Sequence, residues 1–136
     1  DNVTTIPSYA FSGCTGLTSI YYTGDVAGWC GISGLGNLMS SSRTLYIGGN
    51  KVEGELIIPN GVASIGICAF SGCTGLTSVT IPDSVTSIGD HAFSDCSGLT
   101  RFDFTGTIEQ WNEISKGSFW NYRTGSYKIY CTDGTL

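Results

Sequence analysis

The ten residues AFSGCTGLTS occur twice, at 10–19 and 69–78, and a close variant, AFSDCSGLTR, occupies 92–101. Residues 62–79 fall on 85–102 at a shift of 23, and residues 1–17 fall on 83–99 at a shift of 82. A period this short constrains the fold more than any other feature of the chain. One copy of about 23 residues is too small to bury its own apolar face, so neighbouring copies must stack to form a continuous core.

Each copy has the pattern expected for one coil of such a stack. In LTSVTIP (76–82), the residues Val79 and Ile81 alternate as a strand requires, and Pro82 ends the strand because it has no N–H for the ladder. We expect the strand to be followed by a return over the far side, where HAFSDC (91–96) forms a short helical or 3₁₀ turn. The pattern predicts an α/β repeat solenoid with one short parallel strand per coil.

The repeat also predicts which residues fill the core. One aromatic, one thiol and one aliphatic position recur in each copy. A stacked core must fill the equivalent space in every coil at the same packing density, so residues of the same size recur there. These positions are Phe11, Phe70 and Phe93; Cys14, Cys73 and Cys96; and Leu17, Leu76 and Leu99.

Two insertions interrupt the repeat. Residues 21–32 (YYTGDVAGWCGI) match 103–114 (DFTGTIEQWNEI), and 45–50 match 129–134. Asp25 and Thr107 stand where helix N-caps are expected, and Gln110 completes a capping-box pattern with Thr107. We interpret 44–58 as a β-hairpin whose second arm, Glu55–Ile58, is the next repeat strand.

These boundaries divide one domain, 1–136, into three parts. The first is a long unit, 1–55, with its insertion at 21–55; plain repeats at 56–102 and a second insertion at 103–136 follow. The alignment predicts that the second insertion is truncated. Both ends of the stack are expected to leave apolar core or an unpaired strand edge open, which predicts either a fragment of a longer repeat protein or association between copies of the chain through these open ends.

Composition and motifs exclude several classes of function. The net charge is −5 with no cluster of cations, which argues against nucleic acid as a partner, and no apolar run reaches the length of a membrane span. His91 is the sole histidine, no nucleophile elbow surrounds a serine, and no Cys-x-x-Cys pair occurs. We therefore predict no enzyme activity, no catalytic residue, no metal site and no cofactor.

The repeat text at 56–102, together with the aromatic-Thr-Gly, Trp and Ile positions of the insertions, resembles the BspA-like leucine-rich repeat proteins. The chain departs from the general leucine-rich pattern at Asn2, Gly61 and Ser84, so no asparagine ladder is expected. The resemblance implies a right-handed leucine-rich-repeat solenoid from a bacterial cell-surface or secreted protein that mediates adhesion or protein recognition. The expected partner is a protein ligand on the surface of a host or neighbouring cell. A structural spacer or self-association module of a longer surface protein is the alternative.

Two groups of residues are candidates for binding a protein ligand. Strand alternation turns one set outward from the sheet, namely Tyr21, Glu55, Ile57, Thr80, Arg101 and Asp103. The second set is the aromatic cluster of SFWNYR: Phe119, Trp120 and Tyr122. Aromatic residues in loops favour interfaces, although packing within the insertion would account for this cluster equally well.

Overall fold

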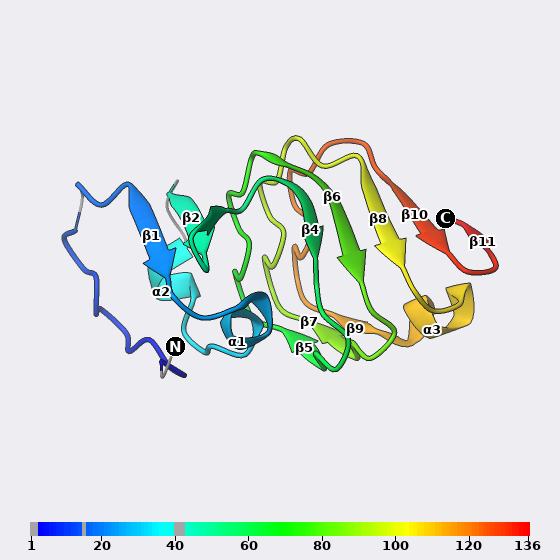
Figure 1. The fold of residues 1–136 in the computed structure, drawn as a ribbon, viewed down its shortest axis with the longest axis horizontal. Coiled ribbons are helices and arrows are strands. Elements are labelled where there is room, and N and C mark those ends of the chain that lie inside the picture. Colours follow the sequence, from blue (N-terminus) through cyan, green and yellow to red (C-terminus); the bar gives the residue numbers. More distant parts are fainter. Residues whose placement is uncertain (1–2, 15, 40–42) are drawn as a thin grey trace.

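The computed structural model describes residues 3–14, 16–39 and 43–136, which form two stacks of strands and a separate three-stranded sheet at one end (Figure 1). The front sheet has the order β11-β10-β8-β6-β4, in which β4 (Gly54–Ile57), β6 (Leu76–Ile81), β8 (Arg101–Phe104) and β10 (Lys128–Cys131) are parallel and β11 (Gly134–Thr135) is antiparallel. The back sheet is parallel and consists of β5 (Ser64–Ile65), β7 (Ser87–Ile88) and β9 (Ser115–Lys116). The N-terminal sheet contains β1 (Ser19–Tyr22), β2 (Thr44–Ile47) and β3 (Asn50–Lys51).

The register of both stacks follows the period of the sequence. Val79 of β6 lies opposite Phe102 of β8, and Ile65 of β5 lies opposite Ile88 of β7. Both pairs are 23 positions apart in the chain. Each plain repeat is therefore one coil, and successive coils lie directly on one another, as the periodicity predicts.

The core runs between the two stacks. Phe70 and Phe93 are 0% exposed, and their rings stack with centroids 5.5 Å apart at an interplanar angle of 13°. Cys73, Cys96, Leu76 and Leu99 are also buried. The Cys96 thiol donates to the Phe70 carbonyl at 3.1 Å, so a repeated core thiol bonds to the backbone of the preceding coil.

The first copy departs from the expectation that all nine core positions face inward. Phe11 is 36% exposed, Cys14 is exposed, and Leu17 is half-buried. Among the described residues β1 pairs only with β2, so no coil covers the other side of this copy. In the copy at 69–78 the same three positions, Phe70, Cys73 and Leu76, are buried, because the next coil lies on one side and the first insertion, with Trp29, lies on the other.

The far side of each coil also differs from the prediction, because it carries a second short strand and no helix. The back-sheet strands are two residues long, and residues 89–96 continue as consecutive tight turns in which the N–H of Ala92 bonds to the carbonyl of Gly89 (3.2 Å). His91 (φ 56°) and Asp95 (φ 61°) lie in the left-handed region, which interrupts any helical run. The equivalent pairs have the same conformation: Tyr9 and Gly13, Cys68 and Gly72, and Phe119 and Arg123.

The helices of the two insertions are confirmed. Asp25 caps α1 (Val26–Cys30) by accepting from the Gly28 N–H at 2.8 Å, and Thr107 forms a capping box with Gln110 at α3 (Ile108–Glu113). A further short helix, α2 (Gly36–Met39), was not predicted. Trp29 joins α1 to the repeats, since its indole N–H donates to the Ala69 carbonyl at 2.7 Å.

The predicted hairpin at 44–58 is wrong in its second arm. The arms are β2 and β3, with Ile47 opposite Asn50, whereas β4 joins the front sheet beside β6. Gly54, with φ 67°, redirects the chain between β3 and β4, and its N–H bonds to the Gly75 carbonyl at 2.9 Å. The same hairpin recurs in β10 and β11, where Cys131 lies opposite Gly134.

Candidate functional site: the outward face of the front sheet

The outward side chains of the front sheet form two rows that cross its parallel strands. Leu56, Val79, Phe102 and Ile129 are buried beneath the sheet, so their neighbours in sequence point outward. The register aligns the first row as Glu55, Ser78, Arg101 and Lys128, and the second as Ile57, Thr80, Asp103 and Tyr130. We call this surface the front face.

Five of the six residues predicted for this surface lie together on it. They are Glu55, Ile57, Thr80, Arg101 and Asp103. The sixth, Tyr21, belongs to the N-terminal sheet, where it is 70% exposed and stacks on Tyr46 with ring centroids 4.5 Å apart. Tyr21 is thus separated from the front face because β3 and β4 do not pair.

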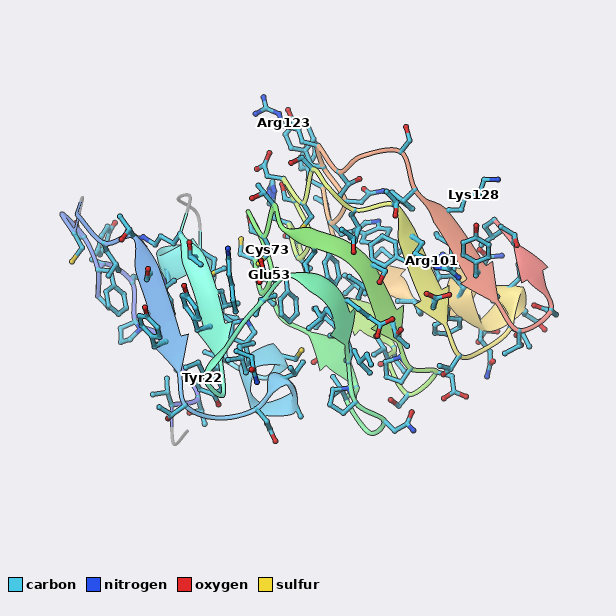
Figure 2. All side chains as sticks on the ribbon, turned by 45° about the horizontal axis from the view of Figure 1, so that its top comes forward. Tyr22, Glu53, Cys73, Arg101, Arg123 and Lys128 are labelled. Carbon is cyan, nitrogen blue, oxygen red and sulfur yellow. The ribbon has the colours of Figure 1, made fainter. Side chains whose placement is uncertain are left out.

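Arg101 is held by hydrogen bonds and a ring contact on the front face. Its Nε and Nη2 donate to the two carboxylate oxygens of Asp103 at 2.9 and 2.6 Å, and its guanidinium carbon lies 4.1 Å from the centroid of the Tyr130 ring. The hydrogen bond to Asp103 is the main cause that raises the pKa of Arg101 above its ordinary value. Figure 2 shows Arg101 on β8 and Lys128 on the neighbouring strand β10. A planar cation fixed in this way loses little side-chain entropy when it binds a partner.

Two residues of the front face, Lys128 and Tyr130, were missed by the sequence reasoning. They are displaced from the 23-residue period because the α3 insertion lies between β8 and β10. The alternation of KIYC at 128–131 and the alignment of Tyr130 with Tyr46 were the signals that could have found them.

The aromatic cluster of SFWNYR is not on the front face. It forms the turn after β9, which is a further copy of the far-side turn. Trp120 occupies the position of Ala92 in this copy. The N–H of Phe93 donates to the Trp120 carbonyl at 2.8 Å, just as the N–H of Phe70 donates to the Ala92 carbonyl. Trp120 is half-buried and packs in tilted and T-shaped geometry against core rings: Phe93, Phe102, Trp111 and Tyr127.

Phe119 and Tyr122 remain exposed at this turn. Phe119 is 59% exposed and Tyr122 is 42% exposed, and their ring centroids lie 5.3 Å apart. Phe119 also stacks on His91 of the preceding coil at 5.4 Å, and Arg123 lies over the Tyr122 ring at 5.1 Å. The predicted aromatic surface is therefore reduced to two residues and is distinct from the front face.

Three cysteines, Cys30, Cys73 and Cys96, are buried in the core. Burial raises the pKa of Cys30 and Cys96 to about 12 and that of Cys73 further still, which keeps these thiols protonated at neutral pH. His91 places Nδ1 3.4 Å from the Ser94 hydroxyl. In the part of the chain that the structure describes, no three His, Cys, Asp or Glu side chains gather as metal ligands would, and no helix is long and apolar enough to span a membrane.

Comparison with protein families agrees with the repeat architecture. The family described as "BspA type Leucine rich repeat region" matches residues 1–28 and 50–131 in 6 copies. No curated protein matches the chain. A solved structure that matches is a leucine-rich cell surface protein from Faecalibacterium prausnitzii, with 27% identity and a TM-score of 0.46 over 85% of this chain. The chain spans about a third of that protein, since the match covers 33% of its length.

Proposed function

Because this chain belongs to the BspA-type leucine-rich repeat family, we propose that it is a non-enzymatic recognition module of a bacterial cell-surface or secreted protein, which binds a protein ligand on its front face. We further propose that the coils wind as a right-handed solenoid. This handedness is the one found in nearly all crossovers between parallel strands of one sheet, and β4, β6, β8 and β10 are parallel strands joined by such crossovers.

The observation that carries this function is the contrast between the two sides of the front strands. The inward positions repeat as buried apolar residues, as Val79 and Phe102 illustrate. The outward positions differ in charge and size from strand to strand, from Glu55 through Ser78 to Arg101 and Lys128. Packing imposes repetition on the first set and leaves the second set free to be selected for a ligand.

The composition of the front face suits a protein ligand. Arg and Tyr are enriched among residues that dominate binding energy, and Arg101 stacks on Tyr130 near the middle of the surface. Four parallel strands at about 4.8 Å spacing give a face roughly 20 Å wide, whereas a standard interface buries roughly 800 Å² per partner. We therefore expect this chain alone to bind with about micromolar affinity.

A capture experiment tests the proposed function. The chain is immobilised and exposed to extracellular-matrix and plasma proteins, alongside the variants Arg101→Ala and Tyr130→Ala. Arg123→Ala is the matched control, because Arg123 is also an exposed arginine beside a tyrosine ring but lies on the far-side turn, away from the front strands (Figure 2). We expect capture by the native chain and by Arg123→Ala, with about tenfold weaker binding by the front-face variants. A failure to capture any protein at micromolar concentrations would contradict recognition by this chain.

The spacer or self-association role is the second candidate. It is favoured by the exposure of apolar residues on the first copy, where Val3 is 49% exposed, Tyr9 is 85% exposed and Phe11 is 36% exposed. Size-exclusion chromatography with light scattering tests it. Self-association through this copy predicts a dimer that Phe11→Ser weakens and Arg101→Ala does not. A monomer at high concentration would exclude self-association and leave the spacer role.

A further inference from the structure

The strand β4 has a neighbour on only one side. It pairs with β6, and within the described part of the chain no strand pairs with its other edge. The chain reaches β4 directly from β3, which pairs with β2 in a separate sheet. The N-terminal sheet and the front sheet are therefore separate, and Figure 1 shows β1 and β2 apart from β4 and β6.

The free edge of β4 exposes the backbone groups to which another strand would bond. Ile58 donates its N–H to the Thr80 carbonyl at 3.0 Å, toward β6. Alternate residues of a strand direct their N–H and C=O groups to opposite sides, so Glu55 and Ile57 direct theirs away from β6. An unpaired row of this kind is a template for strand addition.

A groove lies beside this edge. It has a volume of about 250 Å³ and an apolar lining that includes Val26, Ile47, Val52, Leu56 and Ile57. Ile57 is 57% exposed, so a large apolar side chain at the edge of the groove faces solvent. The volume suits one apolar side chain of an added strand, below the roughly 300–1,000 Å³ of a small-molecule pocket.

The polar rim of the groove has a net negative charge, because it contains Glu53, Glu55 and Lys51. Glu53 forms an ion pair with Lys51 at 3.4 Å, whereas Glu55 has no ion-pair partner among the residues described. A basic side chain on the occupant would therefore find Glu55 available, while an acidic one would be repelled by Glu55.

From this edge, its groove and its charge we infer that β4 is a docking site for an extended peptide segment in which basic and apolar residues alternate. The peptide adds a strand to the front sheet, pairs with the backbone of Glu55 and Ile57, and places one apolar side chain in the groove. Backbone bonds supply the affinity, and the groove and Glu55 supply the selectivity. This site goes beyond recognition by the front face, because it forms hydrogen bonds with the backbone of an unfolded segment at the edge of the sheet.

The probe is a pool of synthetic peptides of about eight residues, capped at both ends, in which Lys or Arg alternates with Val, Ile or Leu. Binding is followed by fluorescence anisotropy and by the amide NMR shifts of Glu55 and Ile57. We expect saturable binding with shifts at both amides, at least about tenfold weaker binding of a Glu/Val pool, and no binding when alternate peptide amides are N-methylated.

Variants of the protein separate backbone pairing from side-chain contact. Ile57→Pro removes the N–H that points to the free edge, where proline is tolerated, and we expect it to abolish binding. Ile57→Ala keeps the N–H and should weaken binding only about threefold to tenfold. Glu55→Lys should reverse the preference between the two pools, whereas Glu113→Lys, an exposed position in the last turn of α3, should not change it.

Several results would overturn this assignment. They are the absence of shifts at Glu55 and Ile57 with the basic pool at about 1 mM, equal binding of the N-methylated pool, and equal binding of the acidic pool. Because these tests use peptides, they do not depend on the folding of Ile57→Pro. Arg101→Ala should not weaken binding of the basic pool, because it removes a cation that interacts with Glu55, whereas it should weaken capture by the front face. The edge site and the front face can therefore each fail without the other.

Discussion

The replacement of Phe70 by alanine tests the claim that stacking on both sides buries a repeated position. Phe70 is 0% exposed and stacks on Phe93 of the next coil, with ring centroids 5.5 Å apart. Removal of a fully buried phenylalanine side chain costs about 3–5 kcal/mol, from lost transfer free energy and the cavity that remains. We therefore expect Phe70→Ala to lower the free energy of unfolding by this amount, a large fraction of the roughly 5–15 kcal/mol of a typical domain.

Phe11 provides the matched control, because it occupies the same place in the same ten letters. It is 36% exposed, and no described coil covers its outer side, so its removal leaves no closed cavity. We expect Phe11→Ala to cost about 1 kcal/mol. Urea unfolding followed by tryptophan fluorescence measures both values, with the slope of each transition showing whether the unfolding reaction has changed.

Equal losses for the two variants would refute this reasoning. They would mean that the local sequence, and not the number of neighbouring coils, determines how much a copy contributes to stability. A double-mutant cycle of Phe70 and Phe93 adds a second check, because stacked rings in contact should show a coupling of about 0.5–1.5 kcal/mol.

Three further predictions concern stability. Gly89→Ala should lower the free energy of unfolding by about 2 kcal/mol or more in urea titrations, because a Cβ there would lie 2.6 Å from a backbone nitrogen of the preceding coil. Gly31→Ala is the control, since a Cβ at Gly31 would lie 3.7 Å from its nearest contact and should change this free energy little. Thr107→Ala should cost about 1 kcal/mol in the same assay through loss of the capping box. Raising the pH above about 9 should destabilise the reduced protein. Burial raises the pKa of the Cys96 thiol to about 12 from an ordinary value of 9.0, so this thiol ionises at lower pH in the unfolded chain than in the folded one. Its contribution to stability is therefore complete below pH 9 and is lost as the pH rises toward 12. Each such thiol should contribute about 1 kcal/mol of this loss by pH 10, and Cys96→Ala should reduce the slope of stability against pH.

The sequence predicted the parts of the fold that repetition and local chemistry determine. The 23-residue period gave the register of Val79 against Phe102, and the side chains of Asp25 and Thr107 marked the helix starts. Both signals are local or periodic, so they can be recognised in the sequence without knowledge of the three-dimensional neighbours. The same holds for Arg101 and Asp103, which strand alternation placed on the front face.

The remaining features depend on contacts that the sequence does not encode locally. The back strands are only two residues long, as in Ser87–Ile88, too short for an alternating pattern. Phe11 has the same local sequence as Phe70 and differs only in the coils around it. Trp120 packs against the core at the position that Ala92 occupies in the preceding coil. This equivalence is hidden in the sequence because the α3 insertion displaces the copy that contains Trp120 from the 23-residue period.

The most direct test of recognition by the front face is lysine labelling of the chain with and without its captured ligand. Lys128 lies on the front face in the row of Arg101, whereas Lys51 lies on β3 in a separate sheet, and both are exposed. We predict that bound ligand lowers acetylation of Lys128 at least about fivefold, measured by mass spectrometry, and leaves Lys51 unchanged. Unchanged labelling of Lys128 in the saturated complex would contradict the assignment of recognition to this surface.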